Sequence, residues 1–546
     1  MKFLVLSVTF AVAALGMAQE SPPLFPGTGL HARDVGLERP EARRLFHQGL
    51  AFLFAFNHDE AIRSFQAASE IEPRNPMPYW AIAIANGPHI NNPVVDADHA
   101  KAAWDALQLA RAHIGQAKPV DQMLIRAAER RYAMPQPSNR SMLDRAYADA
   151  MRRVWRSSPQ DPDVGALFAE AMMDLRPWDL WRPDGSPQPG TAEIVATLER
   201  VLRLNPRHPL GNHLYIHAVE ASPHPEKGLP AADRLRELQP GLGHMVHMPS
   251  HIDVRVGAWD KAIEANRRAI LVDAAYRAKS PDQNFYRVYM AHNHHMLAFA
   301  AMMNGQSKRA IEAMDGILTL FPAEWLEALA PLIDGFLAMP IEVRKRFGLW
   351  DDVLAYPEMG RSFPLARTMR HQARAVAYAA QNRLTEARAE QQAFYKARRE
   401  IAPGATFGNN SASLLLSIAH HLMNGEILLA EGKLDASIRE LRKAVESEDQ
   451  VRYDEPPDWI QPTRHTLGVV LLKAGRPGEA ERVYRADLQR LPSNGWSLFG
   501  LAQALAMQGK TKSSAATLRK FREVWRHADV QIGSSCLFVP RPHPGR

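Results

Sequence analysis

The chain has a single cysteine, Cys536, among its 546 residues. No disulfide can therefore form within the chain, so packing of apolar side chains or a bound metal must stabilise the fold. Apolar residues make up 46% of the sequence and charged residues 23%. These proportions are ordinary for a folded soluble protein and exclude a largely disordered chain.

Long runs of one charge are also missing. The net charge of +7 is spread over the whole chain. Arginine occurs only in short groups such as Arg130-Arg131 and Arg152-Arg153. Because neither a basic stripe nor a recognised module is visible, we expect no nucleic-acid binding.

The only long apolar run lies at the N-terminus, MKFLVLSVTFAVAALGMAQE. Lys2 precedes the run, and Gly16 and Ala18 supply the small residues of a secretory signal peptide, so residues 1–18 are expected to be removed. No cysteine follows for a lipid anchor, and no later run approaches the ~20 apolar residues of a membrane-spanning helix. We therefore expect an exported protein, periplasmic or secreted, without a membrane span.

Signatures of common enzymes are absent as well. No Gly-x-Ser-x-Gly elbow occurs. Gly509-Lys510-Thr511 resembles the end of a phosphate-binding loop, but Ala504 stands where its first glycine belongs. His213 and His217 have the spacing of a zincin helix, but Leu214 replaces the catalytic glutamate. None of these three chemistries is therefore indicated.

What the chain does contain is a histidine-rich stretch that repeats. Ten of the 22 histidines lie between His208 and His295. His213 and His217 recur 34 residues later as His247 and His251. A period of 34 residues is typical of helical hairpins that stack into a solenoid.

Other positions follow the same register, which resembles that of the tetratricopeptide repeat family. In residues 42–75, Gly49 and Ala61 are small where two helices approach, Phe65 fills the gap, and Pro73 ends the second helix. Matching residues recur in other units, including residues 291–324 and 461–494.

The resemblance implies an all-α fold, a right-handed solenoid of about ten or eleven hairpins. We expect an irregular segment at 19–40, hairpins at 41–206 with an insertion near 176–190, histidine-rich repeats at 207–325, further hairpins at 326–530 and a flexible tail at 531–546.

The register also predicts which side chains share a surface. The resemblance implies that positions 2, 5, 9 and 12 of the first helix line the concave face, where tetratricopeptide proteins usually hold ligands. Three successive repeats place histidines and one glutamate there: His213, His217 and Glu220; His244, His247 and His251; His292 and His295. Glu170, at position 9 of the preceding repeat, would join them.

These side chains suit a transition metal. Histidines three or four apart share a helix face, and packed helices lie about 8–10 Å apart, so two helices can share one ion. Neutral imidazoles with a carboxylate favour zinc, copper, iron or nickel over calcium or magnesium. We favour His213, His217, His247 and His251 as ligands, with Glu220 as a fifth ligand, an orienting partner or a general base.

Two functions remain open at this point. The first is a binding scaffold that holds a protein, peptide or small molecule in the groove. Its metal, zinc, copper or iron, would be a structural ion or a cargo. The second is a metal-dependent hydrolase or oxidase with Glu220 as base. A closed site of four protein ligands favours the scaffold, and an open position beside a carboxylate favours the enzyme. Without a metal, the groove would hold a peptide or an anion beside partly charged histidines.

Two further segments could serve the groove. The acidic, aromatic loop at 453–459 contains Asp454, Glu455 and Trp459, and is either a set of ligand contacts or an ordinary helix start. Trp181 either walls the groove or packs the insertion against its own repeat. His208 and His224 are expected at the surface.

The segments at 213–220, 247–252 and 292–295 also resemble a group of exported bacterial tetratricopeptide proteins with HxxIHxxE, HMPSHI and HNHH-like segments. This resemblance supports the fold and export, and it carries no assigned activity.

Overall fold

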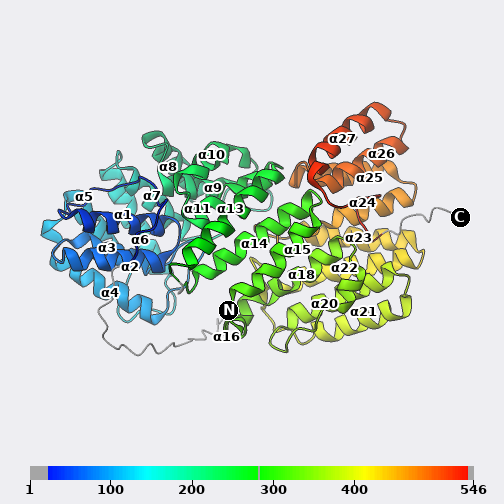
Figure 1. Ribbon diagram of the computed structural model, residues 1–546, viewed down its shortest axis with the longest axis horizontal. Coiled ribbons are helices and arrows are strands. Elements are labelled where there is room, and N and C mark those ends of the chain that lie inside the picture. Colours follow the sequence, from blue (N-terminus) through cyan, green and yellow to red (C-terminus); the bar gives the residue numbers. More distant parts are fainter. Residues whose placement is uncertain (1–21, 281–282, 539–546) are drawn as a thin grey trace. The chain divides into compact units, whose positions relative to one another are not determined.

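The computed structural model describes residues 22–280 and 283–538 (Figure 1). The chain divides into two compact units: a first unit of residues up to Ile252 together with Arg268–Met290, and a second unit of Asp253–Arg267 together with residues from Ala291 onward. The predicted signal peptide, residues 1–18, lies outside the described residues. Elsewhere the predicted all-α fold is confirmed. The strands in the described part are the two-residue pair β1 (Thr406–Phe407) and β2 (Asn410–Ser411), which are antiparallel.

The first unit is built from consecutive antiparallel helices. They are α1 (Pro40–Phe54), α2 (His58–Ile71), α3 (Pro76–Ala85), α4 (Ala97–Ala112), α5 (Pro119–Ala128), α6 (Ser141–Ser157), α7 (Pro162–Met173), α8 (Thr191–Leu204), α9 (Pro209–Glu220), α10 (Leu229–Leu238) and α11 (Gly243–His247), with 3-10 turns at Ile114–Gln116 and Pro225–Gly228. Three helices include residues of both units: α12 (Pro249–Arg255), α13 (Trp259–Arg277) and α14 (Tyr286–Met303).

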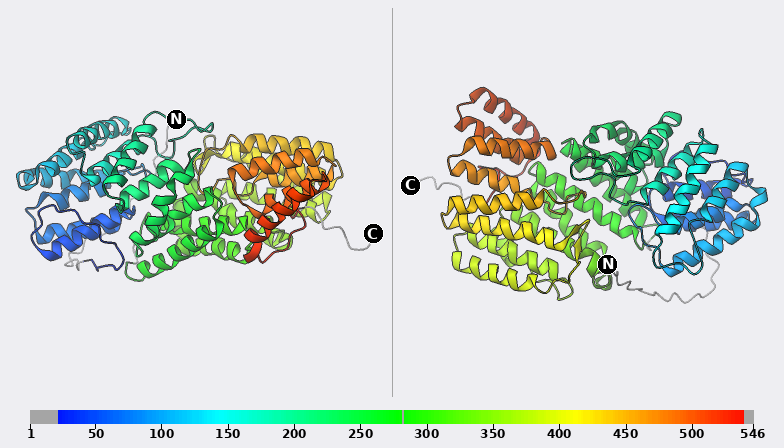
Figure 2. Two further views of the ribbon diagram at one scale, coloured as in Figure 1. Left: turned by 90° about the horizontal axis from the view of Figure 1, so that it is seen from above. Right: turned by 180° about the vertical axis from the view of Figure 1, so that it is seen from behind.

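The second unit continues the helical pattern. Its helices are α15 (Ser307–Ile317), α16 (Ala323–Ala328), α17 (Ala330–Ile333), α18 (Met339–Arg346), α19 (Trp350–Ala355), α20 (Pro364–Ala380), α21 (Leu384–Arg398), α22 (Ala412–Ala430), α23 (Leu434–Glu448), α24 (Thr463–Lys473), α25 (Pro477–Arg490), α26 (Gly495–Met507) and α27 (Thr511–Val524), with 3-10 turns at Leu318–Leu320, Asp334–Ala338 and Trp525–His527. Figure 2 shows the helices from α20 to α27, coloured yellow-green to red, stacked side by side.

The small residues of the repeat register lie where two helices touch. A Cβ atom at Gly49 of α1 would lie 2.4 Å from the ring of Phe65 in α2. In the hairpin of α24 and α25, a Cβ at Gly468 would lie 2.3 Å from the ring of Tyr484. Glycine at these positions therefore lets an aromatic ring from the second helix pack directly onto the backbone of the first.

Replacing Gly49 with alanine should therefore destabilise the protein, although alanine favours helices. The added methyl group would overlap the ring of Phe65, which is fully buried, and overpacking of this kind costs about 1–3 kcal/mol. Denaturant unfolding measures the effect. The matched control is Gly478→Ala in α25, where the nearest atom would lie 3.8 Å away; equal loss in both variants would contradict the packing argument.

One helix of the described residues, α22, is long and apolar enough to cross a membrane by length and composition alone. More than half of its apolar window is buried inside the protein. It packs against α20 and α23 within the second unit, which is the environment of a core helix in a helical repeat.

The sequence predicts a flexible tail from residue 531 onward, but several of the first residues of this segment are buried. Ser535, Cys536 and Phe538 are buried. The Ser535 hydroxyl donates to the carbonyl of His465 at 2.8 Å. The glycine and proline residues of this segment predicted a frayed end. Burial of the apolar side chains between them instead stabilises the folded segment.

Candidate metal centre

Helix α9 carries the first two histidines of the cluster. It begins at Pro209, and the imidazole of His208 caps it by accepting from the backbone N–H of Gly211 at 3.0 Å. All residues of α9 are buried. Polar side chains on such a helix must find their partners inside the protein.

The second helix of the cluster, α11, is short because Pro249 follows it. Proline lacks the N–H that would continue the helix, so the chain restarts as α12 at Pro249. Gly243 allows the start of α11 to approach α13, since a Cβ there would lie 2.0 Å from the carboxylate of Asp273. This arrangement places His244 opposite α9.

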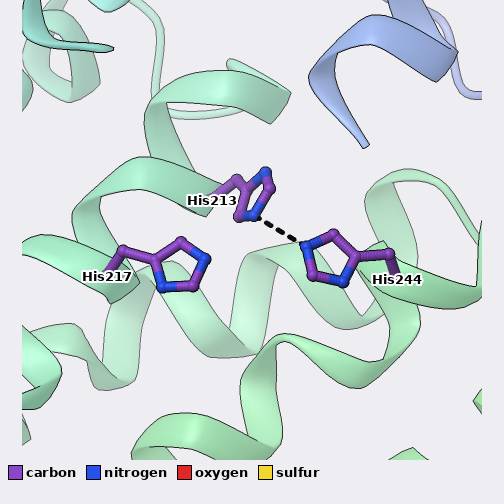
Figure 3. A group of neighbouring side chains, drawn as sticks. All are labelled: His213, His217 and His244. Atoms are coloured by element: carbon purple, nitrogen blue, oxygen red, sulfur yellow. Dashed lines mark hydrogen bonds between the residues drawn. The ribbon is translucent and has the colours of Figure 1, made fainter. Parts of the chain in front are cut away.

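Three imidazoles meet at this point. One ring nitrogen from each of His213, His217 and His244 lies within 4.8 Å of the others. The Nε2 atoms of His213 and His244 are 3.1 Å apart, and Figure 3 shows these two nitrogens pointing toward each other, with His217 beside them. All three side chains are at most 5% exposed.

The tautomers of two rings follow from their partners. His213 Nδ1 lies 2.7 Å from the carbonyl oxygen of Phe54, and His217 Nδ1 lies 2.8 Å from Glu220 Oε1. A carbonyl or carboxylate oxygen only accepts, so each Nδ1 carries the proton and each Nε2 keeps its lone pair. Within the described residues, His217 Nε2 is buried without a hydrogen-bond partner.

Glu220 connects this group to a second pair of histidines. Its Oε2 accepts from His251 Nδ1 at 2.6 Å. His251 Nε2 in turn lies 2.7 Å from His247 Nε2. The structure thus places His244 beside His213 and His217, and Glu220 joins His217 to His251, which lies beside His247.

Burial sets the charges of the cluster. Desolvation lowers the pKa of His213 and His244 well below 6.5, and it lowers that of His217 even though Glu220 opposes the shift. Burial raises the pKa of Glu220, but His251 and His217 outweigh it and hold that pKa at about 2. At neutral pH His213, His217 and His244 are therefore neutral, and Glu220 is ionised.

The metal-free protein should lose stability as the pH falls below 6.5. Six buried histidines of the first unit have lowered pKa values, chiefly through desolvation: His58, His89, His208, His213, His217 and His244. Since their folded pKa values lie below the unfolded value, the unfolded chain binds more protons between the two, and each group costs up to ~1.4 kcal/mol per pH unit. We expect a loss of at least ~2 kcal/mol between pH 7.5 and pH 5.

Chemical unfolding at the two pH values, with chelator present, measures this loss. Substituting glutamine at His213 and His217 should make the dependence on pH shallower. A free energy of unfolding that stays constant from pH 7.5 to pH 5 would show that these imidazoles are not buried as neutral groups.

An aromatic wall around the cluster was not predicted. The ring of Phe56 lies 4.5 Å from that of His213 and 4.6 Å from that of His89, measured between centroids. Tyr289 lies 4.7 Å from His244, and Trp178 meets His217 edge-on at 5.3 Å. The register within one repeat cannot predict these contacts, because they join distant parts of the chain. The one local sign in the sequence was Gly87-Pro88, which interrupts the helical pattern just before His89.

Two other predicted residues of the first unit have partners outside the cluster. Glu170 in α7 is close to Arg131 and Asp174, and burial raises its pKa to about 7 while Arg131 opposes the shift. Trp181 donates its Nε1–H to the carbonyl of Ala218 at 2.8 Å, so it packs the insertion onto α9. The other predicted residues belong to the second unit: His292, His295, Asp454, Glu455 and Trp459.

The prediction that His208 lies at the surface is wrong. His208 is fully buried, and its Nε2 lies 2.9 Å from Asp163 Oδ1. Its place at a repeat boundary suggested exposure, but the side chain caps α9 and bonds to α7. His224 is exposed, as predicted.

Comparisons with known proteins show only distant structural similarity. No family model and no curated protein matches the chain. Among solved structures it is similar to the human IFIT1 dimer with m7Gppp-AAAA, at 12% identity over 89% of this chain and 91% of that one, with a TM-score of 0.33. It is also similar to the APC/C hetero-tetramer Cut9-Hcn1, at 12% identity over 90% and 77%, with a TM-score of 0.31. Likeness this distant says nothing of function, and the fold rests on the helical hairpins themselves.

Proposed function

We propose that the first unit binds one transition metal ion, zinc, copper or iron, through the Nε2 atoms of His213, His217 and His244. The chain would then be a metal-binding helical-repeat scaffold. The observation that carries this proposal is the convergence of three buried nitrogens, two of which keep their lone pairs because their Nδ1–H groups are bonded elsewhere.

The spacing of two of these nitrogens fits a metal. With metal–nitrogen bonds of about 2.0–2.1 Å, the 3.1 Å between His213 Nε2 and His244 Nε2 corresponds to an angle of about 100° at the ion. This angle is close to the tetrahedral value. Imidazole nitrogen is a preferred donor for zinc, copper and iron.

Glu220 supports the proposal as an orienting carboxylate. Metal-bound histidines usually donate their other ring N–H to a carboxylate or carbonyl, which fixes the ring and raises its basicity. His217 has this arrangement with Glu220, and His213 has it with Phe54. Both oxygens of Glu220 are bonded to imidazoles, so the carboxylate is poorly placed to take a proton from water.

A metal-dependent hydrolase or oxidase is the second candidate. Three protein ligands leave a position for water or substrate, as in catalytic zinc sites, and this ligand count is the observation that favours an enzyme. Its base would be a group other than Glu220. A scaffold would instead fill that position with a peptide or small-molecule partner.

Cobalt titration of the metal-free protein tests the site. We expect saturation at one cobalt per chain with intense visible absorption, because nitrogen ligands in tetrahedral geometry strengthen these bands relative to hydrated cobalt. A shift of the bands on adding azide would reveal an open position and favour the enzyme. A spectrum that stays that of hydrated cobalt would contradict the proposal.

Export is part of the same proposal. It is supported by the signal-peptide pattern of residues 1–18. Mass spectrometry of the protein from its native host would identify the mature N-terminus; a chain that retains Met1 and stays in the cytoplasm would contradict export.

A further inference from the structure

The second unit contains a buried polar cluster of its own, centred on Lys345 of α18. Four other side chains surround it: Glu342 of the same helix, Gln372 of α20, Glu426 of α22 and Trp459 before α24. Each of the five residues is at most 4% exposed. All five belong to the second unit, so the cluster is independent of the histidine site.

Part of the cluster is satisfied internally. Lys345 Nζ lies 2.5 Å from Glu342 Oε2 and donates to Gln372 Oε1 at 2.9 Å. The same ammonium lies 5.6 Å from the ring centroid of Trp459. Glu426 is held through Oε1, which accepts from the Thr466 hydroxyl at 3.4 Å.

Four polar atoms remain without a partner among the described residues. Two are acceptors, Glu342 Oε1 and Glu426 Oε2, and two are N–H donors, Gln372 Nε2 and Trp459 Nε1. Buried polar atoms are normally hydrogen-bonded because desolvation without a partner is unfavourable. Four such atoms around one lysine therefore leave both donor and acceptor capacity unused in this cluster.

The charges restrict which molecule could use this capacity. Glu342 and Glu426 carry two negative charges when ionised, and Lys345 supplies one positive charge. Burial raises the pKa of Glu426 to about 7, with Lys345 opposing the shift, so this carboxyl group is partly ionised at neutral pH. A cation in contact with both carboxylates would balance it.

Nearby Arg346 does not supply this balance, although it follows Lys345 in the chain. Its Nη2 bonds to His465 Nδ1 at 2.9 Å, and its guanidinium stacks 3.6 Å from the ring centroid of Trp496. The residue is thus engaged with α24 and α26.

We propose that this cluster binds a small organic amine that also carries an oxygen acceptor. The ammonium would donate to Glu342 Oε1 and Glu426 Oε2, and the oxygen would accept from Gln372 and Trp459. Amino alcohols and amino amides have this chemistry. The site requires no metal and no residue of the first unit.

Calorimetric titration of the full-length protein tests the proposal with two probes, ethanolamine and glycinamide, and with acetamide as a neutral comparison. We expect saturable binding of at least one amine at one site per chain and none of acetamide. The variant E426Q should weaken amine binding at least tenfold, because it removes a charge with little change in size. The control is E446Q, which makes the same change at an exposed position of α23.

Trp459→Phe provides a second test if E426Q fails to fold, since it removes the indole N–H and keeps an aromatic ring at this position. It should also weaken binding. Binding should persist in a variant with glutamine at His213 and His217, which separates this proposal from the metal site. Absence of saturable binding of both amines, equal binding of acetamide, or equal weakening by E446Q would overturn it, and would leave ordered water as the occupant.

Discussion

Replacing His213 and His217 together with glutamine should lower metal affinity by at least about a thousandfold, because two of the three proposed ligands are lost. The protein should still fold. Glutamine is polar and similar in length, and its amide can donate to the carbonyl of Phe54 as His213 does now. Competition for zinc with a coloured chelator measures the affinity, and circular dichroism checks the fold.

The control for this variant is His224→Gln. His224 is exposed, and its side chain bonds to Glu226, so its replacement should leave the affinity unchanged. If the double variant binds zinc as tightly as the wild type does, the metal site must lie away from α9. Equal loss in the control would show non-specific binding to surface histidines.

Replacing Glu220 with glutamine should weaken metal binding by about 10- to 100-fold, the usual effect of losing a carboxylate that orients a ligand. The carboxylate accepts from His217 Nδ1 and His251 Nδ1 at the same time. An amide has one oxygen and one NH₂ group, so it can serve only one of these rings unchanged. The other ring must turn or move its proton to Nε2; where that ring is His217, one lone pair is lost from the proposed ligands.

The same zinc competition measures this effect, with Glu226→Gln as the exposed control. Unchanged affinity in the Glu220 variant would contradict the orienting role. If an activity is found, loss of turnover at unchanged metal affinity would instead identify Glu220 as the base and support the enzyme.

The helical hairpins could be predicted because their signals are local. Gly49, Phe65 and Pro73 sit at fixed spacings in one hairpin: the ring of Phe65 packs on Gly49, and α2 ends at Ile71, just before Pro73. The pairing of His213 with His217 followed in the same way, since residues four apart share a helix face.

The grouping of the other histidines could not be predicted from the repeat register. The register treats residues 243–276 as one ordinary repeat, with an unbroken first helix. Pro249 divides that helix into α11 and α12, so His251 no longer shares a continuous helix face with His244. The contacts of His213 with Phe54 and Phe56 join residues more than 150 positions apart, and no local pattern contains them.

The most direct test of the metal centre is elemental analysis of the mature protein, purified without a histidine tag. The proposal predicts about one equivalent of zinc, copper or iron per chain, lost in the folded variant with glutamine at His213 and His217. Wild-type protein that carries no metal as purified and takes up none on titration would contradict it.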